Sequence, residues 1–406
     1  MSSLYLKNNM LISLLFAVFL TTSINIEYGM GFSAVLMLLV SVVGLVATRN
    51  EEYQPLQTWE KYWVASLFFF VGLVYIDILR GFGGIGDIDS QSRLLLAIPV
   101  YLYIRRVGIN LKIVLIGIAV AAMLTGVYAW YQHVELGIAR VSSFTNAIYY
   151  GDISIMLFVL CVVSALSVKN AWFKLLLFIC SFFMLYAVLS SGTRGGWVAL
   201  STLFILFVSY NVWNISLWKR LLSLILFVVV LVGAYHSPNL IVKQRVDSAI
   251  DQVSSYYTDG KMSSVRYRLE MWKASYLSAK DHNFFGAGEG SFRPEVVRLA
   301  KDGLIDKSLQ QFVGPHSQYF NALLDQGIVG LMSLILIFII PITVLLNSLN
   351  NHNEPNKTAI LPLALLLVFM EFMLTISALE IQIMSLFFSF TLSIFLGLFT
   401  HNRNYE

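Results

Sequence analysis

Residues 175–208 read LLLFICSFFMLYAVLSSGTRGGWVALSTLFILFV, two apolar segments separated by a short turn that carries one arginine, Arg194. Both segments are apolar enough to lie in lipid, where about 20 such residues cross the hydrocarbon core as a helix. A charge between them is costly unless it has a partner, a ligand or access to the membrane surface. This stretch therefore predicts two consecutive membrane helices with a functional or interfacial arginine at their junction.

The composition of the whole chain predicts the same class. Its 406 residues are 58% hydrophobic and 12% charged, with a mean hydropathy of +0.74, whereas a soluble domain has about 25% charged residues. Cys161 and Cys180 lie inside apolar runs and indicate neither a disulfide nor a metal site. We expect an all-α polytopic membrane protein, with no nucleic acid among its partners.

About twelve segments qualify as membrane spans by length and hydropathy. They are residues 9–26, 30–47, 62–79, 92–105, 113–131, 152–168, 175–192, 197–213, 221–236, 328–346, 360–379 and 381–399. The fourth is short and contains Pro99, which predicts that it is broken or re-entrant.

The distribution of Lys and Arg predicts the orientation of these spans, because short cytoplasmic loops are enriched in both. With the N-terminus placed in the cytoplasm, the inside loops hold twelve Lys and Arg residues and the short outside loops hold four. Both termini are therefore expected in the cytoplasm.

A long connection interrupts the pattern of spans on the outer side. It covers residues 238–327, and its segments at 244–259 and 263–281 predict amphipathic helices, with a glycine-rich turn, FFGAGEGSF, at 284–292. We expect three parts: transmembrane helices in 1–237, a helical subdomain in 238–327, and transmembrane helices with a cytoplasmic tail in 328–406.

The turn around Arg194 resembles an anion site. Gly195 and Gly196 leave the backbone bare, and they open the next helix, whose first N–H groups have no partner inside that helix. A guanidinium beside such a terminus suits a phosphate. The alternative is an arginine that extends to the membrane surface.

The long connection adds further candidates. Arg266 and Arg268 lie two residues apart, so on a helix they point in different directions. His316 precedes a short helical segment and could accept a proton from a hydroxyl, or it could be a hydrogen-bonded structural histidine. Arg140 and Asn146 lie in another outer loop whose polar composition suits sugar binding. None of these patterns predicts a metal site.

Three motifs together resemble the O-antigen ligase and polymerase superfamily of the Gram-negative envelope. They are SGTRGGW at a span end, SSVRYRLEMW in the long connection, and HSQYFNALLDQGIVG with His316, Tyr319 and Gly327 at the family's spacing. FTNAIYYGD at 144–152 is also similar, although the family more often has proline where Ala147 stands.

The resemblance implies a glycosyltransferase of the GT-C type in the inner membrane, with its active site on the periplasmic face. The donor would be O-antigen linked to undecaprenyl diphosphate, and the acceptor a sugar hydroxyl of lipid A–core. The transfer would be inverting, without metal or cofactor. It implies catalytic roles for His316, Arg194 and Arg268, with Arg266 adjacent. Arg266, Gly195, Gly196, Arg140, Asn146 and Tyr319 are expected to bind substrate.

Other functions stay open at this point. An O-antigen polymerase uses the same donor but a lipid-linked acceptor, and it more often has two large loops. An oligosaccharyltransferase acting on protein usually has a longer chain. A transporter or flippase would place its charges in the middle of the membrane, whereas here they gather on one side. We therefore favour the ligase.

Overall fold

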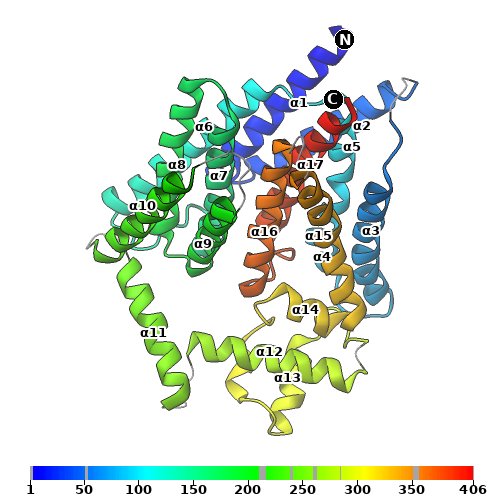
Figure 1. Cartoon of the computed structure of the whole chain (residues 1–406). Coiled ribbons are helices and arrows are strands. Elements are labelled where there is room, and N and C mark those ends of the chain that lie inside the picture. The colour runs from blue at the N-terminus through cyan, green and yellow to red at the C-terminus, as the bar shows by residue number, and fades with distance from the viewer. Residues whose placement is uncertain are drawn as a thin grey trace.

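The structure is a computed structural model that describes residues 3–50, 54–209, 216–237, 241–258, 263–283, 285–350 and 356–405. Every regular element in these ranges is a helix (Figure 1). Nine helices of the described chain are long and apolar enough to cross a membrane. They are α2 (Gly29–Ala47), α3 (Thr58–Leu79), α6 (Leu111–Trp130) with its extension η1 (Tyr131–Glu135), α7 (Ala147–Ser167), α8 (Ala171–Ser191), α10 (Leu217–His236), α15 (Gly327–Leu349), α16 (Ile360–Thr375), which follows η3 (Lys357–Ala359), and α17 (Gln382–Tyr405). The prediction of an all-α polytopic membrane protein is confirmed.

Three predicted spans are not among these nine, because the first is apolar over only Asn9–Thr22, the eighth is short and the fourth is divided. The first is α1 (Ser3–Thr22) and the eighth is α9 (Arg194–Ser209). The fourth consists of α4 (Ile85–Leu96) and α5 (Ile98–Val107). Pro99 lies in the first turn of α5, where its missing N–H breaks no helical hydrogen bond. The expected break is confirmed, while the total of twelve spans stays a prediction.

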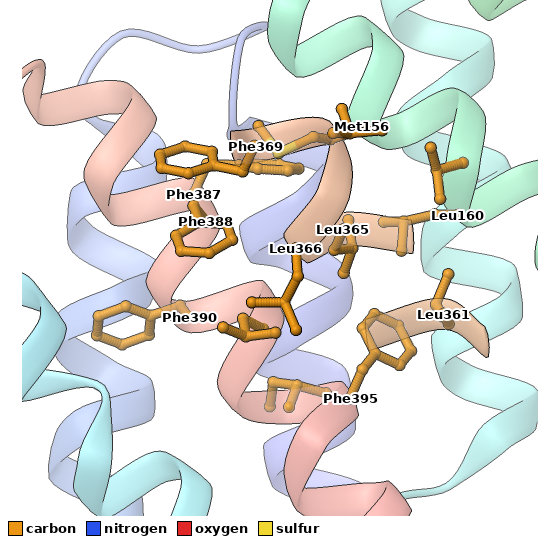
Figure 2. Packing of buried hydrophobic residues seen from close by; sticks show 14 of the residues in the cluster. Met156, Leu160, Leu361, Leu365, Leu366, Phe369, Phe387, Phe388, Phe390 and Phe395 are labelled. Atoms are coloured by element: carbon orange, nitrogen blue, oxygen red, sulfur yellow. The ribbon is translucent and has the colours of Figure 1, made fainter. Parts of the chain in front are cut away.

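Three helices form the centre of the bundle, and α16 lies between α7 and α17 (Figure 2). Phe369 of α16 and Phe388 of α17 are fully enclosed and stack with their ring centroids 3.8 Å apart. Leu365 of α16 lies near Leu160 of α7 (Figure 2). Because lipid is as apolar as these side chains, the contact stabilises the bundle by close packing and not by the exclusion of water.

The long connection folds into helices at one end of the molecule, and α1 begins and α17 ends at the opposite end (Figure 1). Its elements are α11 (Val242–Thr258), α12 (Ser264–Asp281), α13 (Phe292–Lys301), η2 (Lys307–Gln311) and α14 (Gln318–Asp325). Helices α12, α13, η2 and α14 share a small core of their own that includes Met271, Phe292, Val296 and Leu309. Val242 of α11 instead packs with Leu189 of α8 and Ala234 of α10. We call this end of the molecule the loop end.

The glycine-rich turn packs against the end of α14, the last helix of the connection before α15. The N–H groups of Ala287 and Gly288 donate to the carbonyls of Leu324 and Asp325 at the end of α14, at 2.8 and 2.9 Å. Gly286 has φ +88°, and a Cβ there would lie 2.2 Å from the Asp325 carbonyl oxygen. Only glycine meets both requirements. The sequence pattern correctly indicated a turn, and the structure shows why it needs glycine.

Candidate functional site

Four arginines from distant parts of the chain gather where α8 ends at the loop end. They are Arg140 in the loop before α7, Arg194 at the start of α9, Arg245 in α11 and Arg268 in α12. Arg194 lies within electrostatic range of the other three. Burial lowers the pKa of Arg140 and of Arg268, and the charge of Arg245 lowers both further. Such mutual repulsion favours binding of an anion among them.

The turn between α8 and α9 holds two of these arginines in place. Gly192 ends α8 with φ +64°. Arg140 Nε donates to the carbonyl of Ser191 at 3.1 Å, and Arg245 Nε donates to the carbonyl of Gly192 at 3.2 Å. Positive groups are stabilised at a helix C-terminus by its free carbonyls and dipole. The backbone of α8 therefore orients both guanidinium groups.

Within the described part of the chain, two guanidinium groups also carry buried donors without a protein partner. Arg194 donates through Nη1 to Gln252 Oε1 and through Nη2 to Ser248 Oγ, each at 3.2 Å. Its Nε is buried and has no hydrogen-bond partner among the residues that the structure describes, and the same holds for Nη2 of Arg140. A buried donor left without an acceptor costs about 1–3 kcal/mol. A ligand with acidic oxygens would supply the missing acceptors.

The two glycines after Arg194 have different surroundings. A Cβ on Gly195 would lie 3.5 Å from Thr375 Oγ1, an ordinary contact. Gly196 is buried, and a Cβ there would lie 3.3 Å from Ile155 of α7. The missing side chain of Gly196 thus allows close packing of α9 on α7, which differs from the expected role of leaving room for a ligand. Its N–H still belongs to the first turn of α9.

His316 lies beside the arginine cluster, at the start of α14. The residue is exposed, and its backbone adopts φ +50°, which is uncommon for a side chain other than glycine and typical of functional sites. Its ring makes an edge contact with Phe312, with ring centroids 5.8 Å apart. Neighbouring protein that excludes part of the water around the ring lowers the pKa of His316, and Arg268 lowers it further. The structure therefore brings His316 and Arg268 together.

The position of His316 follows from the anchoring of α14 to α16. Ser317 Oγ donates to the carbonyl of Met373 at 3.2 Å. The N–H of Leu379 donates to Gln318 Oε1 at 2.9 Å. Tyr319 donates its hydroxyl to the carbonyl of Met370 at 2.9 Å, and burial raises its pKa to about 12. Tyr319, predicted to bind substrate, thus forms a helix–helix contact.

The two arginines of α12, Arg266 and Arg268, lie near different groups, as their spacing predicted. Arg268 acts on Arg194 and His316. Hydrogen bonds from Ser308 lower the pKa of Asp306, and the charge of Arg266 lowers it further. Arg268 therefore faces the cluster, whereas Arg266 lies near Asp306 after α13.

The ring of Trp272, one turn after Arg268, stacks on Phe320 of α14 with ring centroids 5.1 Å apart. This contact fixes α12 against the helix that follows His316.

Arg140 and Asn146, which were both predicted to bind substrate from the loop before α7, lie in different surroundings. Arg140 belongs to the cluster. Asn146 is exposed and caps α7, because its Oδ1 accepts the N–H of Ile148 at 2.9 Å. This bond explains the asparagine without a substrate, so these contacts give no support to the predicted sugar-binding role.

Arg245 was missed in the sequence, where QRVD resembles any solvated helix surface. Its neighbours in space, Gly192 and Arg140, lie about 50 or more residues away along the chain. Among the residues that the structure describes, no three side chains of His, Cys, Asp or Glu are grouped as metal ligands would be.

The apolar helices define a multi-pass membrane protein, and the cationic cluster beside an imidazole defines its candidate site. Residues 179–335 match the family model described as O-Antigen ligase. This part of the chain is therefore similar to the O-antigen ligase family, as the motifs predicted, and it contains Arg194, Arg245, Arg268 and His316. A protein of Haemophilus influenzae (strain KW20 / Rd), described as an uncharacterized protein, is 27% identical over 352 residues, which cover 85% of this chain and 87% of that protein.

Proposed function

We propose that the protein is an O-antigen ligase that transfers a glycan from undecaprenyl diphosphate to a sugar hydroxyl of lipid A–core. The observation that carries this proposal is the cluster of four arginines beside His316. The family match supports a lipid-linked glycan transferase in general. The donor, the acceptor and the direction of transfer are our inference.

The arginines fit a reaction whose leaving group is a diphosphate. As the bond between the anomeric carbon and the phosphate oxygen breaks, negative charge grows on that oxygen. Fixed guanidinium groups stabilise such charge, and a planar guanidinium can bind two phosphate oxygens at once. The unpaired Nε of Arg194 and Nη2 of Arg140 are available as donors.

His316 is suited to accept the proton of the acceptor hydroxyl. Its lowered pKa keeps the ring neutral near pH 7. The acceptor oxygen would bond to the anomeric carbon from the side opposite the diphosphate, while its proton passes to His316. Because the new carbon–oxygen bond forms on the side opposite the bond that breaks, the configuration of the anomeric carbon is inverted. The diphosphate leaves while still attached to its lipid.

We further propose that the protein lies in the inner membrane, with the loop end in the periplasm and both termini in the cytoplasm. The excess of Lys and Arg in the loops assigned to the inside supports this orientation. So does the position of both chain ends away from α12 and α13 (Figure 1). Labelling of single cysteines at Arg403 and at Arg293 with an impermeant thiol reagent tests it. The reagent should reach only position 293 in intact spheroplasts.

The main test is complementation in cells that lack their own ligase. His316→Ala removes the proton acceptor, so we expect transfer to fall about 10²–10⁴-fold. Arg194→Lys keeps the charge but loses bidentate contact, so we also expect a severe loss. Lipopolysaccharide ladders on gels, with quantification of glycan on lipid A–core, measure both effects.

Matched controls are His282→Ala and Arg293→Lys, which lie in the same connection away from the cluster and should leave ladders normal. Normal ladders from both site variants would overturn the proposal. Because the donor is shared, a polymerase would behave differently: its loss leaves one repeat unit attached to lipid A–core, whereas loss of a ligase leaves lipid A–core bare.

A further inference from the structure

An apolar groove opens between α6 and α8 towards the surrounding membrane. It has a volume of about 340 Å³ and is lined by Gly126, Val127, Trp130, Phe182, Phe183 and Tyr186. Val127 and Phe182 are 51% and 64% exposed. Gly126 is required here, because a Cβ would lie 2.4 Å from the Cβ of Phe183. The groove is therefore formed by a close approach of two helices, with aromatic walls.

The groove lies between one and two turns of α8 from the arginine cluster, on the side away from the loop end. Tyr186 precedes Ser191 by five residues on α8, which is about 7–8 Å along a helix axis. The Ser191 carbonyl is the acceptor of Arg140 Nε. Trp130 and Tyr186 at the groove are the residue types that concentrate at the membrane surface. A lipid whose phosphates bind the arginines would thus bring its first apolar carbons to this groove.

The arginines also define a direction across the site. His316 is within electrostatic range of Arg268, and Arg268 is within range of Arg245. Arg245 is within range of Arg140, which is bonded to the end of α8. The order therefore runs from the imidazole, through the cations, to the groove. A donor lying along it has its anomeric carbon at one end and its lipid at the other.

We infer that the groove between α6 and α8 binds the apolar chain of the lipid-linked donor at the carbons next to the diphosphate. This inference rests on the proposed function, because it needs a donor with a diphosphate between lipid and glycan. Since lipid is as apolar as the groove, the groove contributes by packing and by orientation, with little gain from removing apolar surface from water. Its effect is to align the diphosphate with the arginines.

Val127→Trp fills the groove and tests the inference in purified enzyme. With a donor carrying a long isoprenoid chain, we expect kcat/KM to fall about tenfold, an effect of orientation. With a donor whose diphosphate carries only a methyl group in place of the lipid, which cannot reach the groove, we expect little change. The matched control is Val120→Trp, two turns earlier on the same face of α6 and 40% exposed, which should behave as the wild type with both donors.

A second measurement reads binding directly. A donor analogue with a photoreactive diazirine on the isoprene unit next to the diphosphate should label peptides of α6 and α8, less so in Val127→Trp. Equal kinetics for the two tryptophan variants, or labelling confined to other helices, would overturn the inference. A diazirine phospholipid that labels the groove and is not displaced by donor would also overturn it, because the occupant would then be bulk lipid. Failure of the wild type to transfer from either donor would instead overturn the proposed function.

Discussion

Arg245 shows how a residue acquires a role from its neighbours. In sequence it is one charge on an amphipathic helix, but it donates to the Gly192 carbonyl and acts on three other arginines. Arg194, Arg268 and His316 were predicted from sequence motifs. Arg194 was a candidate because a charge beside two glycines at the end of a membrane span is costly unless it has a partner, a ligand or access to the membrane surface. Asn146 and Tyr319 were assigned to substrate, and they form a helix cap and a helix–helix hydrogen bond.

The pH dependence of transfer should report the environment of His316. A proton acceptor works only when neutral, so activity is lost as the pH falls through its pKa in the folded protein. Neighbouring protein that excludes part of the water, together with Arg268, holds that pKa below 6.5, so we expect the acid limb of kcat/KM below pH 6.5. In Arg268→Gln the pKa rises towards 6.5, and the limb should move to higher pH.

A series of initial rates from pH 5 to 8, at constant ionic strength, measures this limb. A wild-type limb above pH 6.5, or an identical limb in the residually active Arg268→Gln, would contradict the assignment of His316 as the base. Arg266→Gln is the matched control, because Arg266 acts near Asp306 and should leave the limb unmoved.

At the scale of elements, periodicity and hydropathy predicted the helices well, and boundaries less well. The fourth span divides into α4 and α5, as Pro99 indicated. The helices expected in the long connection are present as α11 and α12. Which surface each helix presents to the others depended on contacts such as Trp272 with Phe320, which no local pattern encodes.

Gly286, in the turn before α13, and Gly303, just after α13, together give a prediction about stability. Gly303 has φ +72° with open space around it, so Gly303→Ala should cost about 1–2 kcal/mol from backbone strain alone. Gly286→Ala adds a collision with the Asp325 carbonyl, so it should cost about 1–3 kcal/mol more. Thermal unfolding of the two variants in detergent measures the difference. Equal losses would show that the close contact between the glycine-rich turn and the end of α14 does not add to stability.

At the scale of the whole molecule, buried carboxylates join the connection to the bundle. Asn321 donates to Asp325 Oδ2 and to Glu380 Oε1, and Gln326 donates to Glu289 Oε2 at 2.7 Å. Burial and neighbouring acids raise the pKa of Glu380 to about 8 and that of Glu289 to about 7. Glu380 lies in the turn between α16 and α17, so the network links that turn to α14 and the glycine-rich turn.

This network predicts that alkaline conditions weaken the fold. Glu380 has a folded pKa raised above 4.5, so its stabilising effect is complete below pH 4.5 and is lost as the pH rises towards about 8. Glu380→Gln, which cannot ionise, should therefore unfold at a higher temperature than the wild type above pH 8, with the difference shrinking towards pH 5.

Melting temperatures from pH 5 to 9 in detergent measure this difference. Asp306→Asn serves as control, because the pKa of that exposed carboxyl is lowered and it stays ionised over this range. A difference between Glu380→Gln and the wild type that does not change with pH would contradict the prediction.

The sequence by itself determined the class of the molecule and most of the residues in its candidate site. Apolar runs of membrane length have one satisfactory form in lipid, a helix whose backbone groups bond to one another, so no knowledge of their neighbours was needed. Only the tertiary structure decided that Arg140 and Arg245 bind the end of α8, that Gly196 serves packing, and that an apolar groove lies below the cluster. The reason is that each of these depends on distances between residues of different helices, and local periodicity gives only the direction in which a side chain leaves its own helix.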